Sequence, residues 1–262
     1  MFRTFESTTE DAEVTAEGRR ACASSATSAK SSAASAVLVS FSIALLVSAG
    51  SLTVTIRGQQ IGRDSHYPAH WWTPIDDPKK PDWEILPQEA KPGEVILSKR
   101  NELGLLSNFA ATPFVFHEKR YASLEGFWQA MLYPEGPNDP RAKFSGLAWK
   151  YTREQVTQMT AFEAKHAGDL AEENMRKMKI GWVSFEGKHF GYRPTRPGRH
   201  YRLIVAATWA KVLQNDNVRK VLLSTGDLIL KPDHHQEPNA PAAWRYFEIW
   251  MRIRTTLQNR ER

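Results

Sequence analysis

Residues 121–134 read YASLEGFWQAMLYP and carry the strongest secondary-structure signal in the chain. Five large apolar side chains recur at the i, i+3, i+4, i+7 and i+8 spacing that gives a helix one apolar face: Leu124, Phe127, Trp128, Met131 and Leu132. Ser123 is a natural N-cap, because its hydroxyl accepts a hydrogen bond from the first helical turn. The proline-rich run 134–140 ends the segment. The stretch therefore predicts an amphipathic helix that begins after Ser123.

The sequence around this helix predicts short strands and further helices. Strands or hairpins are expected at 93–98, 113–122, 182–192 and 228–230. Helices are expected from capping boxes at Thr152 and Thr160 toward 178, and over 201–214, 218–223 and 244–257. The 201–214 helix is expected to pack through Leu203, Ala206, Ala207 and Ala210. Helices dominate and the order is mixed, so the predicted class is α+β, a compact and mainly helical domain with short β-hairpins.

The N-terminal quarter differs from the rest. Residues 1–35 are low in complexity, and 36–56 are uncharged and long enough to span a bilayer. Three interpretations remain open for 36–56: a membrane anchor, a late signal sequence, or an extension without a structural role. Residues 57–92, rich in Pro and Trp, are expected to form an extended surface linker to a domain at 93–257. The protein is thus expected to be anchored or exported through 36–56, and cytoplasmic otherwise.

Composition narrows the function classes. The single cysteine, Cys22, excludes an internal disulfide and a multi-cysteine zinc site. Residues 1–56 hold four of the 35 basic and five of the 29 acidic residues, which leaves a net charge of +7 for 57–262. This charge favours anionic partners. The phosphate-binding, Rossmann, nucleophile-elbow and zinc-protease motifs GxxxxGK[ST], GxGxxG, GxSxG and HExxH are absent.

Glu125 is the first candidate for chemistry. It lies in the first turn of an aromatic-rich helix, with Trp128 nearby and Gln129 one turn later. A carboxylate desolvated among aromatic rings has a raised pKa, which suits acid–base work. The alternative is a structural role, in which the carboxylate only complements the helix dipole at its N-terminus.

The run LSNFAATPF at 106–114, followed by RYASLEGFWQA at 120–130, resembles the opening motif of the NADAR family, roughly "SNF…PF…G..Y.S.EH.YQA.K". NADAR proteins are N-glycosidases that cleave a base–ribose bond in ribosylaminopyrimidine phosphates or ADP-ribosylated guanine. The resemblance implies a compact α+β fold over about 93–257 and a reaction without a cofactor. It also implies a phosphorylated nucleoside-like substrate, with nucleic acid a partner only when it is ADP-ribosylated.

The resemblance assigns roles to individual residues. Glu125 matches the catalytic glutamate, and Asn108 and Phe109 match the pair that lines the ribose pocket. The remaining matches are Tyr121, Ser123 and Gln129. Phe109, Tyr121 and Trp128 are expected to stack against the base.

The sequence departs from the motif at two positions and in its later part. Gly126 stands where the family has His, and Leu132 stands where it has Lys. The later "D..WG" has no counterpart, so Asp233 or Glu237 is the second acid by position alone. A protein that keeps the pocket but has lost part of the catalytic set would bind an ADP-ribose-like ligand without turnover. That binding module is the alternative function.

Two further clusters of polar side chains allow more than one role. Arg193, Arg196 and Arg199 recur at every third position in YRPTRPGRHYR and are expected to hold phosphate; the alternatives are a solvated basic loop and contact with a nucleic-acid backbone. Asp233, His234 and His235 could ligate a metal, but adjacent histidines in a proline-flanked loop are more often exposed. No metal site is therefore predicted, and the oligomeric state is left open.

Overall fold

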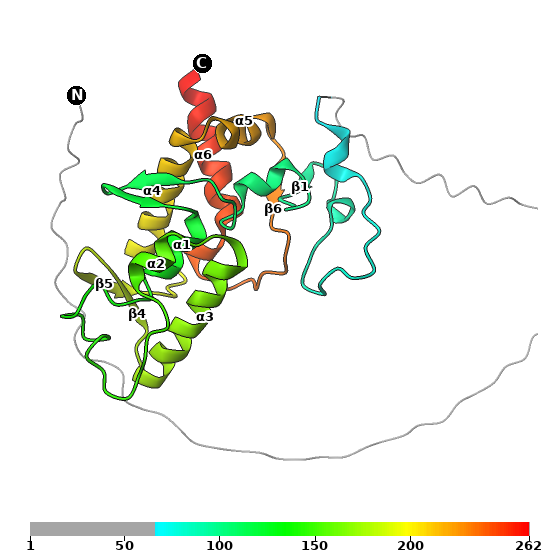
Figure 1. Cartoon of the computed structure of the whole chain (residues 1–262). Helices are drawn as coiled ribbons and strands as arrows, with labels where there is room; N and C mark the ends of the chain where they lie inside the picture. Colours follow the sequence, from blue (N-terminus) through cyan, green and yellow to red (C-terminus); the bar gives the residue numbers. More distant parts are fainter. Residues whose placement is uncertain (1–65, 262) are drawn as a thin grey trace, which may run out of the picture. The chain divides into compact units, whose positions relative to one another are not determined.

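The computed structural model describes residues 66–261, which form an α+β unit (Figure 1). Its α-helices are α1 (Leu124–Ala130), α2 (Arg153–Thr157), α3 (Ala161–Met178), α4 (Arg199–Gln214), α5 (Asp216–Ser224) and α6 (Tyr246–Glu261). Its 3-10 helices are η1 (Ala69–Trp72), η2 (Pro87–Glu89), η3 (Glu102–Leu106) and η4 (Ala242–Trp244). The predicted helices are all found, although the last one begins at Tyr246 after a 3-10 turn.

The strands of this part of the chain form three two-stranded sheets. Two are the predicted hairpins, in which β2 (Phe114–Phe116) pairs with β3 (Lys119–Tyr121) and β4 (Trp182–Phe185) with β5 (Lys188–Gly191). The third joins distant segments: β1 (Glu94–Ile96) runs parallel to β6 (Ile229–Lys231). Because the two strands point the same way, the residues that follow them emerge at one edge.

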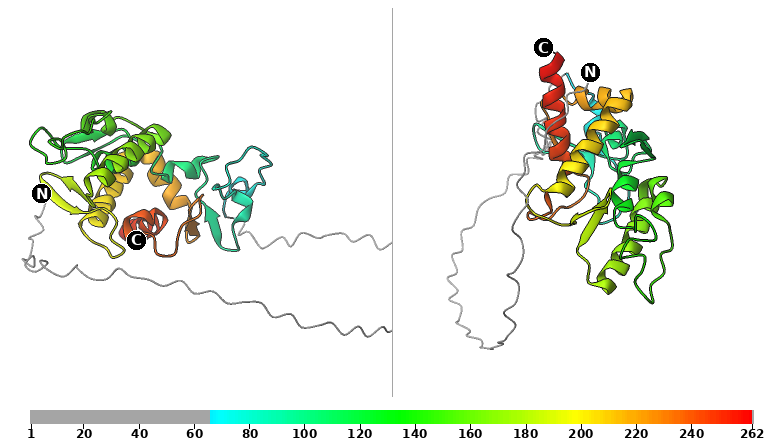
Figure 2. Two further views of the ribbon diagram at one scale, coloured as in Figure 1. Left: turned by 90° about the horizontal axis from the view of Figure 1, so that it is seen from below. Right: turned by 90° about the vertical axis from the view of Figure 1, so that its left-hand side faces the viewer.

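Helix α1 is buried along its whole length. It packs against α2, α3 and α4, while α6 lies beside α4 and α5 (Figure 2). Ser123 caps α1 as predicted: its hydroxyl accepts from Gly126 N at 2.9 Å and donates to Met159 O at 2.9 Å. One serine therefore fixes both the start of α1 and its distance from the turn after α2.

The buried face of α4 is rotated by one position from the predicted one. The buried residues are His200, Ile204, Ala207, Thr208, Lys211 and Val212, whereas Ala206 is exposed. The prediction is confirmed for Ala207 and in part for Leu203 and Ala210, which are half-buried against the core, and it was wrong for Ala206. The shift was missed because the buried face contains a lysine, a residue that is rarely buried. The Thr152 capping box is confirmed, but the Thr160 side chain makes no cap hydrogen bond.

The segment expected to be a surface linker is described from residue 66 onward. Trp71 and Trp72 are 1% and 5% exposed and belong to the same core as α1. This part of 57–92 is therefore built into the domain. Residues 1–35 and the hydrophobic segment 36–56 lie outside the described residues. Within 66–261, no helix has the length and apolarity that crossing a bilayer requires.

Gly126 leaves no room for a side chain. A Cβ at this position would lie 2.7 Å from Met159 O and 2.9 Å from Val156 O, both backbone atoms. The backbone at the end of α2 and in the turn after it therefore packs directly against position 126. We expect Gly126→Ala to lower the free energy of unfolding by about 1–3 kcal/mol through overpacking. Urea denaturation measures the change. Gly181→Ala, where no atom lies within 4 Å of the new Cβ, is the control, and equal effects of the two substitutions would contradict this packing.

Candidate active site

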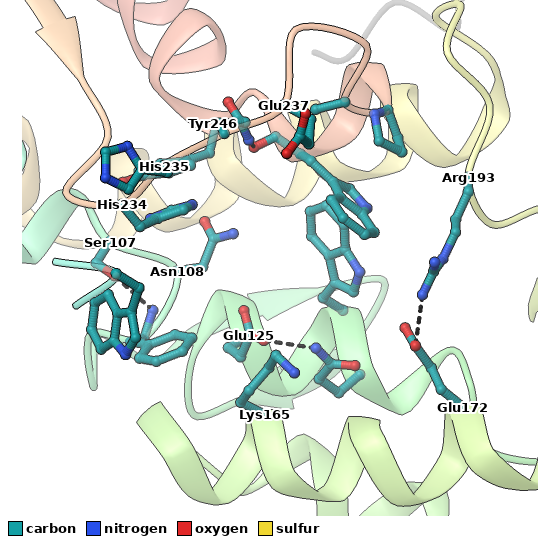
Figure 3. Close-up of a pocket in the computed structure, with 18 of the residues that line it drawn as sticks. Ser107, Asn108, Glu125, Lys165, Glu172, Arg193, His234, His235, Glu237 and Tyr246 are labelled. Atoms are coloured by element: carbon teal, nitrogen blue, oxygen red, sulfur yellow. Dashed lines mark hydrogen bonds and ion pairs between the residues drawn. The ribbon is translucent and has the colours of Figure 1, made fainter. Parts of the chain in front are cut away.

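A cavity of about 970 Å³ lies beside α1 and α3, next to the ends of β1 and β6 (Figure 3). Its polar lining comprises Lys99, Ser107, Asn108, Glu125, Gln129, Lys165, Glu172, Arg193, His234, His235, Gln236, Glu237 and Asn239. Its aromatic lining comprises Trp83, Phe109, Trp128, Phe162, Tyr192, Trp244 and Tyr246. A pocket with apolar walls and a few converging polar groups is typical of a small-molecule site.

The loop 106–109, which carries the LSNF motif, is held by four consecutive backbone carbonyls. Leu106 O accepts from Trp250 Nε1 in α6 at 2.6 Å, and Ser107 O accepts from Lys211 Nζ in α4 at 2.8 Å. Asn108 O then accepts from the first turn of α1, at Glu125 N, and Phe109 O from the start of α3, at Ala161 N. Each carbonyl is thus tied to a different helix, and Asn108 is fixed directly beside Glu125.

Glu125 is the buried acid of the cavity, with 6% of its surface exposed. Burial raises the pKa of its carboxyl group, and the hydrogen bond from Gln129 and the charge of Lys165 counteract this only in part. Gln129 Nε2 donates to Glu125 Oε1 at 2.7 Å. Within the described residues Oε2 makes no hydrogen bond, so one carboxyl oxygen is oriented while the other is left for a ligand.

Asn108 supplies a second unpaired acceptor. Its Oδ1 is buried and has no hydrogen-bond partner among the described residues. A buried carbonyl without a donor costs about 1–3 kcal/mol. A ligand hydroxyl or N–H group that entered the cavity would recover part of this cost. Asn108 and Glu125 together therefore form an acceptor pair suited to a group rich in hydroxyls.

A basic side chain lies against aromatic rings at each side of the cavity. Lys99 Nζ lies 5.3 Å from the ring centre of Phe109 and 5.8 Å from that of Trp83. On the other side, Arg193 stacks over Trp244 at 5.2 Å and pairs with Glu172 at 2.6 Å. Figure 3 shows the Arg193–Glu172 pair across the cavity from Ser107 and His234, with Glu125 between the two sides. Each side thus combines a surface for stacking with a positive charge.

The parallel pair β1–β6 accounts for the position of Lys99. Ile96 is in register with Lys231, so Lys99 and Asp233 follow the two strands at the same edge and form an ion pair there. Asp233 is 1% exposed and lies behind the cavity wall. Burial acts to raise its pKa, but the hydrogen bonds from His234 and Lys99 and their charges hold it below the usual value.

Seven of the predicted site residues line the cavity: Asn108, Phe109, Glu125, Trp128, Gln129, Arg193 and Glu237, the alternative second acid. Tyr121 does not, because the end of β3 turns it into the core, where it stacks on Phe114 at 5.6 Å and burial raises its pKa to about 12. Arg196 is exposed and Arg199 lies against Phe190, so the proline-broken loop brings only Arg193 of the three arginines to the cavity.

Several residues of the site were not predicted from the sequence. Lys99, Trp83 and Phe162 come from segments without a motif, and His234 was expected to be simply exposed. The parallel pairing of two three-residue strands carries no sequence signal that could place Lys99 beside Asp233. Lys211, which binds the Ser107 carbonyl, did have a sequence signal, because it falls on the same face of α4 as Ile204, Ala207 and Val212. Among residues 66–261 no group of three or more His, Cys, Asp or Glu side chains is arranged to hold a metal ion.

No protein-family model matches the sequence, and a search of curated proteins finds no match. Among solved structures the chain is similar to the NMR structure of the E. coli protein YbiA. The identity is 19% over 63% of this chain and 86% of that one, with a TM-score of 0.40.

Gly168 on α3 makes room for Gln129. A Cβ at Gly168 would lie 2.0 Å from Gln129 Oε1 and 2.3 Å from its Cδ, so alanine there must displace the amide. We expect Gly168→Ala to break the hydrogen bond from Gln129 to Glu125 and to lower about tenfold the kcat of a reaction that depends on Glu125, since a hydrogen bond to a charged group contributes about 1.5 kcal/mol. Stability should fall little, because alanine favours the helix by about 1 kcal/mol over glycine. Steady-state kinetics and thermal unfolding measure the two effects.

The matched variant for this prediction is Gln129→Ala, which removes the same hydrogen bond directly. If displacement of Gln129 causes the loss of kcat in Gly168→Ala, the two single variants should lose similar activity, and the double variant should lose no more than either of them. Additive losses would show that Gly168 acts by another route.

Proposed function

We propose that this protein is an N-glycosidase that hydrolyses the bond between a base and ribose in a phosphorylated nucleoside-like substrate. The observation that carries the proposal is the position of Glu125. It is a buried carboxyl group with a raised pKa, oriented by Gln129, and it lies beside the unpaired Asn108 Oδ1 in an aromatic cavity. The resemblance of 106–130 to the NADAR motif supports the same reaction and assigns the principal catalytic role to the same glutamate.

The chemistry that such a site supports follows from the bond to be broken. Loss of a base leaves positive charge on the ribose, and a nearby carboxylate stabilises an oxocarbenium-like transition state. Ionised Glu125 would also accept a proton from the attacking water through Oε2. Its raised pKa makes it a stronger base than an exposed glutamate. Asn108 Oδ1 would accept a ribose hydroxyl and hold the sugar against the carboxylate.

The walls of the cavity support a substrate with a planar ring and phosphate. Aromatic side chains such as Phe109 and Trp128 offer faces on which a base can stack. Lys99 and Arg193 place a positive charge on either side of Glu125, and the Arg guanidinium can bind phosphate with two hydrogen bonds. Bound phosphate would replace Glu172 as the partner of Arg193.

The experiment is base release by the full chain from four compounds: ADP-ribosylated guanosine, a ribosylaminopyrimidine phosphate, NAD and ADP-ribose. Chromatography follows the free base, and Glu125→Gln is assayed beside the wild type. Release of base by the wild type that disappears in the variant is the expected result. Absence of release from all four compounds would contradict the proposal.

A binding module is the second candidate, and two positions favour it. The motif lysine is replaced by Leu132, which is completely buried in the core, and the motif histidine by Gly126, where no side chain fits. Such a module would bind ADP-ribose in calorimetry and release no base. Calorimetric titration with the same four compounds separates this function from the glycosidase.

A further inference from the structure

The proposed reaction needs a proton donor for the leaving base, and Asp233 cannot reach it. Its carboxylate is 1% exposed and lies behind the cavity wall. Asp233 instead contacts two side chains that reach the cavity: its Oδ2 binds Lys99, and its Oδ1 lies 3.1 Å from Nδ1 of His234. Lys99 and His234 both line the cavity. Asp233 therefore acts on the cavity through these side chains.

The contact with Asp233 determines how His234 is protonated. An ionised carboxylate only accepts hydrogen bonds, so Nδ1 of His234 carries the hydrogen. The other nitrogen, Nε2, lies on the far side of the ring and makes no hydrogen bond to any of residues 66–261. The side chain is 38% exposed, so water and ligands reach it. An imidazole held at Nδ1 by a buried carboxylate is the arrangement in which Nε2 exchanges protons with a substrate.

The surroundings hold this ring in one place. It stacks on Tyr246 with ring centres 6.0 Å apart and planes at 10°. The backbone of His234 forms a β-bridge with that of Glu84, and Ile85 N donates to Asp233 O at 2.9 Å. Figure 3 shows His234 on the side of the cavity across Asn108 from Glu125. A sugar held by Asn108 would thus lie between the carboxyl group and the imidazole.

We propose that His234 is the general acid of this site and that Asp233 is its positioning residue, an inference that rests on the proposed N-glycosidase function. In the reaction the bond between C1′ and the base nitrogen breaks, and its electron pair goes to the nitrogen. That nitrogen takes the proton from Nε2 of the imidazolium, which leaves a neutral ring whose Nδ1–H still donates a hydrogen bond to the Asp233 carboxylate. Water adds to C1′ and gives its proton to Glu125. A proton returns from Glu125 to His234 through solvent, so the overall change is hydrolysis.

The first test is kinetic, on whichever of the four compounds the wild type hydrolyses. We expect His234→Ala to lower kcat about 10²-fold with KM within threefold, which lies within the range of general acid–base catalysis. Imidazole at 50 mM should restore at least a tenth of the lost activity, and the rescue should follow the imidazolium fraction as pH changes. The titratable groups that contact the ring of His234 are Asp233 and Tyr246. Lys99 binds the other carboxyl oxygen of Asp233, His235 is the next residue along the chain, and Glu84, whose backbone pairs with that of His234, has its carboxylate bound by Arg100.

The matched control is His166→Ala, an exposed histidine on α3 outside the cavity, which should keep wild-type kinetics. A His234→Ala variant with more than a third of the wild-type kcat would overturn the assignment. So would a loss of kcat that imidazole does not reverse, because a structural role is not replaced by the free base.

The second test does not depend on turnover. Nitrogen-15 shifts of His234, assigned by comparison with His234→Ala, report which ring nitrogen carries the hydrogen in the neutral form. We expect Nδ1–H in the wild type and a shift toward Nε2–H in Asp233→Asn, whose amide can donate to Nδ1. A wild-type ring in the Nε2–H form would refute the inference. If no compound is hydrolysed but the Nδ1–H form is found, the glycosidase proposal has failed while the Asp233–His234 pair stands.

Discussion

Glu125→Gln is expected to lower kcat about 10³-fold while the Kd for ADP-ribose stays within threefold of the wild type. Glutamine keeps the size of the side chain and still accepts the hydrogen bond from Gln129. It loses the negative charge that stabilises the sugar cation and the capacity to take a proton from water. General acid–base catalysis contributes about 10²–10⁴-fold, and charge stabilisation adds to this. Single-turnover kinetics and calorimetry measure the two quantities.

The raised pKa of Glu125 also predicts how kcat depends on pH. Because burial raises the pKa of Glu125, the ionised and active form is lost as pH falls through this raised value. The acidic limb of the kcat profile should therefore lie above the pH at which an exposed glutamate titrates. Ionisation of Glu125 also costs folding free energy as pH rises through this range. We expect Glu125→Gln to be at least as stable as the wild type at pH 7.

Glu172→Gln is the matched variant for this prediction. Glu172 lines the same cavity but is paired with Arg193, so its replacement should change KM for a phosphorylated substrate more than kcat. If Glu125→Gln kept more than a tenth of the wild-type kcat, or if the two variants behaved alike, Glu125 would not be the principal catalytic group.

Lys211→Ala is expected to lower the free energy of unfolding by about 3 kcal/mol. Lys211 is completely buried, its Nζ donates to Ser107 O at 2.8 Å, and it lies 5.6 Å from the ring centre of Trp250. Truncation of a long buried side chain leaves a cavity and costs about 2–5 kcal/mol. It also leaves the Ser107 carbonyl unpaired, which adds to the cost. Urea denaturation at pH 8 measures the effect.

Lys211→Met separates packing from titration. Burial lowers the pKa of Lys211 to about 7, so between pH 7 and the ordinary lysine value the unfolded chain binds more protons than the folded one. Wild-type stability should therefore rise with pH in this window, by up to about 1.4 kcal/mol per pH unit from this group. Lys211→Met fills most of the same volume and should lack this contribution. Equal slopes for the two proteins between pH 7 and 9 would show that Lys211 is not held with a lowered pKa.

The sequence predicted the elements well where a local pattern defines them. The apolar spacing and Ser123 gave α1, and the two hairpins and the Thr152 cap are where their residues placed them. The fold class follows from this order of elements. The arrangement of these elements could not be derived in the same way, because the parallel pairing of β1 with β6 depends on packing between distant segments. The buried tryptophans of η1 were missed because a Pro- and Trp-rich segment has no periodicity that indicates a core.

The candidate site was predictable only as far as its residues lie close together in sequence. Asn108, Phe109, Glu125, Trp128 and Gln129 belong to one motif and line one cavity. Tyr121 shares the motif but faces the core, since neighbouring strand residues alternate between the two faces. Asp233 was chosen from its position in the sequence, and the structure places it behind His234.

The four anchored carbonyls of 106–109 have a consequence for protein synthesis. The partners of Leu106 and Ser107, Trp250 and Lys211, are 144 and 104 residues away along the chain. Contacts of such long range form late, because their loop entropy must be overcome before they stabilise anything. A ribosome that has already released α1 and α3 therefore carries a chain whose cavity wall is incomplete. We expect the nascent protein to be unable to bind ligand until α6, near its C-terminus, has emerged.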